Sequence, residues 1–307
     1  MKQRTSARIY WRPHTESTVR NRYRRMLSAW GTHHTERRIS TSQGETFALV
    51  AGRPDHPSVV LIPGSMATSA MWLGTISALA DRFQVIAVDI IGDAGFSSPS
   101  RPRMKSDAHA RWIDDILDAL QVTTASFVGA SFGGWLALDY AIRRSARVSR
   151  LVLLAPAGVG RIRPRFMLKT APLLFLGSWG HKKALAFDMG LSEQGMGVEE
   201  VAFVDLFDAV RSGFVARMQP IPVFSDKALR GLHMPTLVVV GGKDRVFDSQ
   251  QTQQRIEANL SNAEVLMLPD SGHGLVNTTA TICEFMLRAA PVDDSARAVQ
   301  QLAAAQP

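Results

Sequence analysis

The stretch FVGASFGGWL at residues 127–136 decides the fold, because it places a serine where a strand pattern gives way to a helix pattern. ASFV is typical of a buried strand, and the residues after Gly133 carry apolar side chains at helical spacing. A strand that turns sharply into a helix strains its corner residue and lifts that side chain above the sheet. Glycines at 129 and 133 are needed because the two backbones approach closely. Ser131 is therefore a candidate nucleophile; the alternative is an ordinary turn serine, since Gly-x-Ser-x-Gly alone is a weak signal.

Short apolar runs alternate with helical patterns along most of the chain. Strands that are apolar on both faces belong to a sheet covered by helices on each side. The alternation predicts βαβ units and an α/β fold with a doubly wound, mostly parallel sheet, preceded by an antiparallel hairpin formed by ERRIST and ETFALVAG. The expected strands are 58–62, 83–90, 125–130, 150–155, 236–241 and 263–268, and the expected helices lie near 69–82, 106–120, 133–145, 249–259 and 274–289.

About seventy residues after the fourth parallel strand carry no strand pattern and contain helical segments rich in Leu, Phe and Met. Such an interval is too long for a structureless loop, so we expect a helical cap inserted over one end of the sheet. The predicted organisation is a basic N-terminal segment at 1–34, a core at 35–159 and 232–290, a cap at 160–231 and a flexible tail at 291–307. Residues 1–14 are also expected to be frayed.

The net charge of +8 resides in the N-terminal segment, because residues 1–38 hold ten Lys and Arg against two Glu. A solvated arm explains this better than a nucleic-acid surface, which would spread basic residues over a folded face. The basic start is not followed by an apolar stretch, so no signal peptide is expected. The uncharged stretch 57–80 is broken by Pro63-Gly64, which argues against a membrane span. With one cysteine, Cys283, nothing demands an oxidising compartment, and we expect a cytoplasmic protein.

A serine hydroxyl needs a base that removes its proton during attack, and the base needs a carboxylate that orients it. His273 lies in the Gly-rich turn LPDSGHGLV after the last strand, and Asp244 lies in VVVGGKDRVFD just past the preceding strand. The carboxyl ends of parallel strands collect functional groups, so Ser131, Asp244 and His273 are expected to meet there. Asp248 is a rival for Asp244 but is better interpreted as a helix N-cap, and Asp270 is expected to face solvent.

These motifs, in this order, make the chain similar to the α/β-hydrolase superfamily over roughly residues 35–290. The nucleophile elbow corresponds to GASFG, the acid turn to GGKD and the histidine turn to SGHG; MW and DIIGD also resemble bacterial carboxylesterases of the naproxen-esterase kind. The resemblance implies an oxyanion loop after the third strand, here IPGSMATSAMW. In this chain Pro63 stands where the family commonly has histidine, which leaves the geometry of that loop open.

A tetrahedral oxyanion needs two positioned N–H donors. The first expected donor is the backbone amide of Phe132, immediately after the nucleophile. The second is expected from Ser65, with Met66 as the alternative. Asp89 and Asp93 are two isolated carboxylates without a histidine cluster, so we expect no metal and no cofactor.

The pattern predicts a serine hydrolase that cleaves carboxylic esters of hydrophobic small molecules through an acyl-enzyme. The small-molecule ester is the only partner expected; nucleic acid and a membrane span are not, and the oligomeric state is open, with a homodimer possible. Two alternatives remain: a thioesterase of a biosynthetic pathway, and a non-catalytic member of the fold that binds a ligand in the same pocket.

Overall fold

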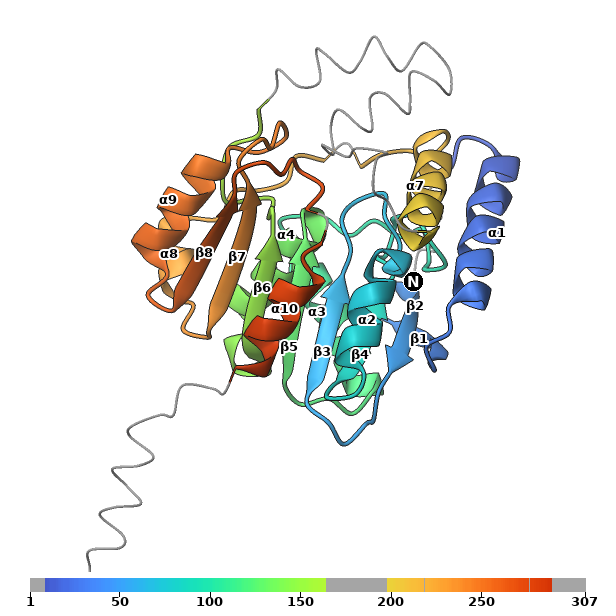
Figure 1. Cartoon of the computed structure of the whole chain (residues 1–307), viewed down its shortest axis with the longest axis horizontal. Helices are drawn as coiled ribbons and strands as arrows, with labels where there is room; N and C mark the ends of the chain where they lie inside the picture. Colours follow the sequence, from blue (N-terminus) through green and yellow to red (C-terminus); the bar gives the residue numbers. More distant parts are fainter. Residues whose placement is uncertain (1–8, 164–197, 218, 276, 289–307) are drawn as a thin grey trace, which may run out of the picture.

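The computed structural model describes residues 9–163, 198–217, 219–275 and 277–288, with the side chains of 198–200 excepted. A single eight-stranded sheet runs through the middle, in the order β1-β2-β4-β3-β5-β6-β7-β8 (Figure 1). Its strands are β1 (Thr35–Thr41), β2 (Gly44–Ala51), β3 (Ser58–Ile62), β4 (Gln84–Val88), β5 (Ala125–Ala130), β6 (Val148–Leu154), β7 (Thr236–Gly241) and β8 (Ala263–Leu268).

The strand directions confirm the predicted sheet. β1 and β2 form the antiparallel leading hairpin, and β2 also lies antiparallel to β4. The six strands from β3 to β8 pair in parallel, which places their carboxyl ends along one edge. β1, at one end of the sheet, carries four consecutive exposed residues, Thr35 to Arg38, before the buried Ile39.

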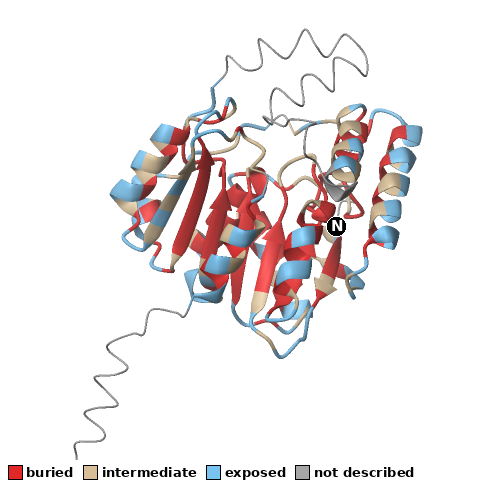
Figure 2. Cartoon of the chain, in the orientation of Figure 1, coloured by how far each residue is buried: buried red, intermediate tan, exposed pale blue. Residues whose placement is uncertain are grey.

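Helices cover both faces of the sheet, and each face has its own hydrophobic core. One core packs the strands against α3 (Ala108–Ala119), α4 (Phe132–Arg143), α8 (Asp226–Arg230) and α9 (Ser249–Asn259). The other packs them against α1 (Pro13–Ala29), the 3₁₀ helix η1 (Ser69–Trp72), α2 (Leu73–Leu79), α7 (Val198–Arg211) and α10 (Thr279–Leu287). The central strands are therefore buried along their length (Figure 2).

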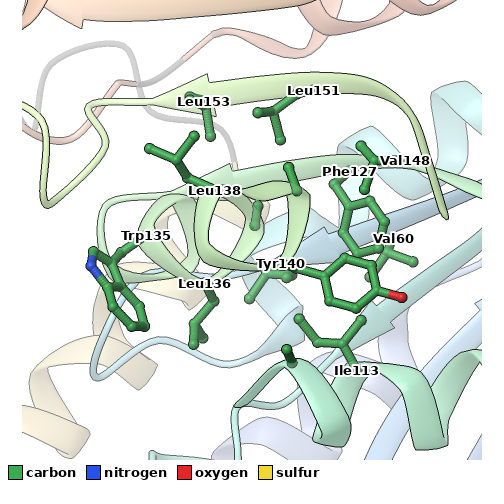
Figure 3. Packing of buried hydrophobic residues seen from close by; sticks show 14 of the residues in the cluster. Val60, Ile113, Phe127, Trp135, Leu136, Leu138, Tyr140, Val148, Leu151 and Leu153 are labelled. Atoms are coloured by element: carbon green, nitrogen blue, oxygen red, sulfur yellow. The ribbon is translucent and has the colours of Figure 1, made fainter. Parts of the chain in front are cut away.

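Helix α4 is buried nearly all round, because it lies in the middle of the first core. Figure 3 shows its residues Trp135, Leu136, Leu138 and Tyr140 among side chains from β3, β5, β6 and α3. The Trp135 indole donates to the carbonyl of Pro222 at 2.9 Å, and the Tyr140 hydroxyl donates to Asp114 at 2.9 Å. Both polar tips thus have partners, as buried aromatic residues of this kind require.

The N-terminal segment differs from its prediction: a solvated arm is wrong for residues 13–29, which form α1. Its buried residues Thr15, Val19, Tyr23 and Leu27 recur every four positions and make one apolar stripe. Frayed ends are also wrong for residues 9–14, since Tyr10 bridges to Phe214. The stripe packs mainly against α7 and η1, while Arg24 and Arg25 remain exposed on the outer face of α1.

The predicted cap 160–231 is described only in part, because residues 164–197 lie outside the described residues. Helices α7 and α8 fall within it, and α8 packs against α9. The tail 291–307 also lies outside the described residues. The last helix begins at Thr279, later than the expected 274, because Asn277 adopts the left-handed conformation with φ 59° that a right-handed helix cannot contain. Among the described helices none is both long and apolar enough to cross a bilayer.

The corner between β5 and α4 leaves no room for side chains at its glycines. A Cβ added at Gly133 would lie 2.2 Å from the carbonyl oxygen of Pro63 and 2.3 Å from that of Ile62. A Cβ at Gly129 would lie 2.4 Å from the carbonyl oxygen of Gly133. Because all these neighbours are backbone atoms, they cannot rotate away, and the close approach requires glycine.

Replacing Gly133→Ala should therefore lower the free energy of unfolding by at least about 2 kcal/mol, because backbone must shift to admit the methyl group. Gly74→Ala is the matched control: Gly74 is an exposed glycine in α2 with no atom within 4 Å of an added Cβ. The control should be neutral or stabilised by about 0.5–1 kcal/mol. Urea denaturation of both variants measures the difference, and equal stability would contradict the close packing of this corner.

Candidate active site

Ser131 lies at the sharp turn between β5 and α4 with φ 50° and ψ −110°, a strained conformation for a residue other than glycine. Two hydrogen bonds hold the turn: the Ser131 N–H donates to the carbonyl of Leu154 at 2.8 Å, and its carbonyl accepts from the N–H of Ala157 at 3.0 Å. The neighbouring strand β6 thus fixes the corner, which directs the hydroxyl away from the core.

The structure brings Ser131, His273 and Asp244 together. The His273 Nε2 lies 3.0 Å from the Ser131 Oγ, and the His273 Nδ1 lies 2.9 Å from the Asp244 Oδ2. The three side chains come from three separate connections after β5, β7 and β8. A continuous hydrogen-bonded chain therefore runs from a buried carboxylate through an imidazole to the serine hydroxyl.

Asp244 is held in place by the turn that carries it. Its Oδ1 accepts from the N–H groups of Val246 at 2.7 Å and Phe247 at 3.1 Å, so that Oδ2 faces the histidine. The residue is only 2% exposed, which strengthens its interaction with the imidazole. The Phe247 ring also packs edge-on against His273 with centroids 5.2 Å apart, and limits the rotation of the imidazole.

The rival residues lie elsewhere. Asp248 accepts from the N–H of Gln251 at 3.1 Å and caps α9, as predicted. Asp270 is exposed and pairs with Lys243 at 2.6 Å. His109 is buried behind the corner, edge-on to Phe132, and burial lowers its pKa to about 3, so it stays neutral.

The loop after β3 faces the serine from the other side. Phe132 is the first residue of α4, where the N–H has no intrahelical acceptor. The Met66 N–H donates to the Asp93 Oδ1 at 2.7 Å, so the alternative oxyanion donor considered above is engaged elsewhere. The Ser65 hydroxyl donates to the Asp93 Oδ2 at 3.0 Å, while Ser65 itself lines the cavity in front of Ser131.

Asp93 organises this loop, a role that the sequence did not reveal. Besides Met66 and Ser65 it accepts from the N–H of Ala94 at 2.9 Å, and Arg217 is a nearby cation. Burial raises the pKa of this carboxyl, and its hydrogen-bond donors oppose the rise. The only sequence signal was the pair of carboxylates in DIIGD, which was considered as a metal site and rejected because no histidine cluster accompanies it.

Asp89 holds a second set of backbone donors next to that loop. Its Oδ1 accepts from the Ser69 N–H at 2.8 Å and the Ser69 hydroxyl at 2.9 Å, and its Oδ2 accepts from the Phe96 N–H at 2.8 Å. Burial raises the pKa of Asp89 to about 6. The Tyr23 hydroxyl of α1 completes the set by donating to Oδ1 at 3.1 Å; burial and the nearby Asp89 raise its pKa, so it remains a phenol.

A cavity of about 90 Å³ opens onto the serine and histidine. Most of its wall is apolar; the lining residues are Gly64, Ser65, Ala67, Met71, Ala130, Ser131, Leu154, Phe203, Phe207, His273, Gly274 and Leu275. A larger hollow of about 380 Å³ beside Arg103 and Arg111 contains neither the serine nor the histidine, so the smaller cavity is the candidate site. Over the described part of the chain, no three His, Cys, Asp or Glu side chains are grouped as metal ligands.

A model of the alpha/beta hydrolase family matches residues 59–281, which include Ser131, Asp244 and His273. The chain belongs to this family. The match covers the parallel strands and the turns that follow β3, β4, β5, β7 and β8. It therefore agrees with the resemblance drawn from the motifs.

Individual relatives of this alpha/beta hydrolase include bacterial esterases. It is 29% identical over 255 residues to the carboxylesterase YbfK of Bacillus subtilis, covering 82% of this chain and 86% of that one. It is 29% identical to a 2-hydroxymuconate semialdehyde hydrolase of a Pseudomonas species, covering 66% and 75%. The crystal structure of a naproxen esterase from B. subtilis superimposes with a TM-score of 0.78 at 25% identity, covering 94% and 99%.

The strained corner of this alpha/beta hydrolase predicts an unusual pair of stability changes. Ser131→Gly and Ser131→Ala both lose the hydroxyl, but only glycine adopts φ 50° without strain. Glycine also increases the entropy of the unfolded chain, which offsets part of the relieved strain. The glycine variant should still be more stable than the alanine variant by about 1 kcal/mol. Thermal denaturation of the two proteins measures this, and a glycine variant that melts lower would argue against strain at this position.

Proposed function

We propose that this alpha/beta hydrolase cleaves carboxylic esters of hydrophobic small molecules through an acyl-enzyme on Ser131. The observation that carries the proposal is the position of His273 between Ser131 Oγ and the buried Asp244. Because a carboxylate only accepts, the Nδ1 facing Asp244 carries the imidazole proton and Nε2 presents its lone pair to the serine hydroxyl. This is the tautomer that a general base requires.

The chemistry follows in two stages. Ser131 Oγ attacks the ester carbonyl carbon while its proton passes to His273 Nε2, and the resulting tetrahedral intermediate expels the alcohol, which takes that proton. A water molecule then attacks the acyl-serine, with His273 again removing a proton, and the carboxylic acid leaves as Ser131 is restored. Asp244 stays ionised throughout and stabilises the transient imidazolium.

The developing oxyanion is proposed to accept from the backbone amides of Phe132 and Ser65. Phe132 is supported by its place at the helix N-terminus immediately after the nucleophile. Ser65 is supported by its place in the cavity wall and by the engagement of the neighbouring Met66 amide with Asp93. In this arrangement Asp93 acts through the loop rather than on the substrate, as a positioning residue.

The apolar wall of the cavity supports an apolar substrate. Met71, Leu154, Phe203, Phe207 and Leu275 line the cavity beside the serine, and none of its lining residues in the described part of the chain is Asp, Glu, Lys or Arg. Two relatives in Bacillus subtilis bear the name carboxylesterase, which supports an ester as the substrate class.

Substituting Ser131→Ala should abolish p-nitrophenyl ester hydrolysis, with a loss of kcat of at least about 10⁴-fold, because it removes the proposed nucleophile. The same variant should no longer react with a fluorophosphonate probe, which labels the native serine. Mass spectrometry of the labelled protein locates the adduct. Ester hydrolysis that survives the substitution would overturn the assignment of Ser131.

The backbone origin of the second oxyanion donor can be tested with two neighbouring variants. Ser65→Ala keeps the main-chain N–H, so kcat should fall by less than about 10-fold, whereas losing an oxyanion donor costs about 10²–10³-fold. Asp93→Ala removes the acceptor that fixes the loop, and kcat should fall by about 10²-fold with a smaller change in KM. Steady-state kinetics on one ester decide this; a larger loss in Ser65→Ala than in Asp93→Ala would assign the role to the Ser65 hydroxyl.

A further inference from the structure

Helix α7 forms part of the cavity wall; the part lined by Phe203, Phe207 and Met71 is called the apolar end of the cavity below. Helix α7 supplies Phe203 and Phe207, whose rings lie 6.1 Å apart and form a small apolar cluster with Met66, Ala67 and Met71. Figure 1 shows α7 beside α1, with α1 on its far side from the sheet centre. The position of the two phenylalanines therefore depends on what holds α7 in place.

Helix α1 holds α7 along its length. The Arg22 guanidinium donates to the Asp205 carboxylate at 2.7 Å and to the Asp205 carbonyl at 2.8 Å. Apolar residues of both helices share one core; they are Val19, Tyr23 and Leu27 of α1 with Leu206, Ala209 and Val210 of α7.

The chain before α1 also holds the segment that follows α7. The Trp11 N–H donates to the carbonyl of Gly213 at 2.8 Å, and the Val215 N–H donates to the carbonyl of Ile9 at 2.9 Å. At Gly213 the two segments touch so closely that an added Cβ would lie 2.3 Å from the Thr15 Cγ2. The C-terminal end of α7 is thus tied to the N-terminal segment by backbone hydrogen bonds.

The same helix reaches the opposite wall of the cavity. The Tyr23 hydroxyl lies against the Ser69 hydroxyl, and both donate to Asp89; Ser69 opens the 3₁₀ helix η1 that carries Met71. Met71 faces the cavity together with Phe203 and Phe207. Helix α1 therefore contacts both elements between which the apolar end of the cavity lies.

We propose that residues 9–29 are a positioning element that sets the width of the apolar end of the cavity, and that Phe203 and Phe207 determine which ester side groups fit there. The inference rests on the proposed ester hydrolysis. Residues 9–29 then act on selectivity through α7, without touching the reacting atoms. A short acyl group remains near Ser131, whereas a long one reaches the two phenylalanines.

The test compares p-nitrophenyl acetate with p-nitrophenyl octanoate in variants that disturb the contact from either side. Arg22→Ala removes the ion pair, and Gly213→Ala forces the Thr15 side chain away from the segment that follows α7. In both, KM for the octanoate should rise about 5- to 20-fold with kcat nearly unchanged, because uniform binding of the chain is lost. The acetate should change by less than about 2-fold.

Arg25→Ala is the matched control, since Arg25 lies on the same helix with an exposed side chain. It should leave both esters unchanged. Phe207→Ala should weaken octanoate hydrolysis more than acetate hydrolysis. Adding Arg22→Ala to Phe207→Ala should raise the octanoate KM by a smaller factor than Arg22→Ala does in the native protein, because both substitutions act on the same cavity wall. Hydrogen exchange of α7 should be faster in Arg22→Ala than in Arg25→Ala, which tests the positioning without any turnover.

Equal losses on the two esters, unchanged selectivity in both Arg22→Ala and Gly213→Ala, or unchanged exchange of α7 would overturn the positioning role. Far-UV circular dichroism and thermal melts separate these results from global unfolding. Failure of the proposed function has a different signature, since neither ester would then be hydrolysed by the native protein in a Ser131-dependent way.

Discussion

The close contact of β5 with α4 at Ser131 is the constraint on which the rest of the site depends. Two glycines allow the backbones to meet, and β6 with the segment that follows it holds the turn through Leu154 and Ala157. The corner thereby fixes where the hydroxyl lies relative to the ends of the other parallel strands. His273 and Asp244 then need only short turns after β8 and β7 to reach it.

Much of this arrangement could be predicted from the sequence, because it follows from local patterns. All six parallel strands read as nearly continuous apolar runs, including β8 at the sheet edge, which has no buried residue, and each was located to within about two residues. Ser131, His273 and Asp244 were found since each lies in a Gly-containing turn directly after a strand. The predicted N-cap role of Asp248 is likewise a local property.

The parts that sequence reasoning missed depend on partners distant in the chain. Arginines lie between the apolar residues of α1, so the sequence does not reveal that these residues are buried. The structure shows it, because Tyr23 contacts Asp89 and Ser69. Asp93 was weighed as a metal ligand because its acceptors are carboxylate oxygens, whereas its partners are the Met66 N–H and the Ser65 hydroxyl of the loop after β3 and the N–H of the adjacent Ala94. Neither set of contacts leaves a residue spacing or a local composition in the sequence from which it could be predicted.

The exposed residues of β1 have a consequence for how the molecule behaves in a crowded solution. A strand at the end of a sheet offers unpaired backbone groups to any other extended chain. In β1 the side chains that flank those groups are Glu36, Arg37 and Arg38, and Arg38 is paired with Glu45 of β2. A second molecule that tried to extend the sheet there would have to strip water from these charges, so this margin of the protein resists fibril-like stacking.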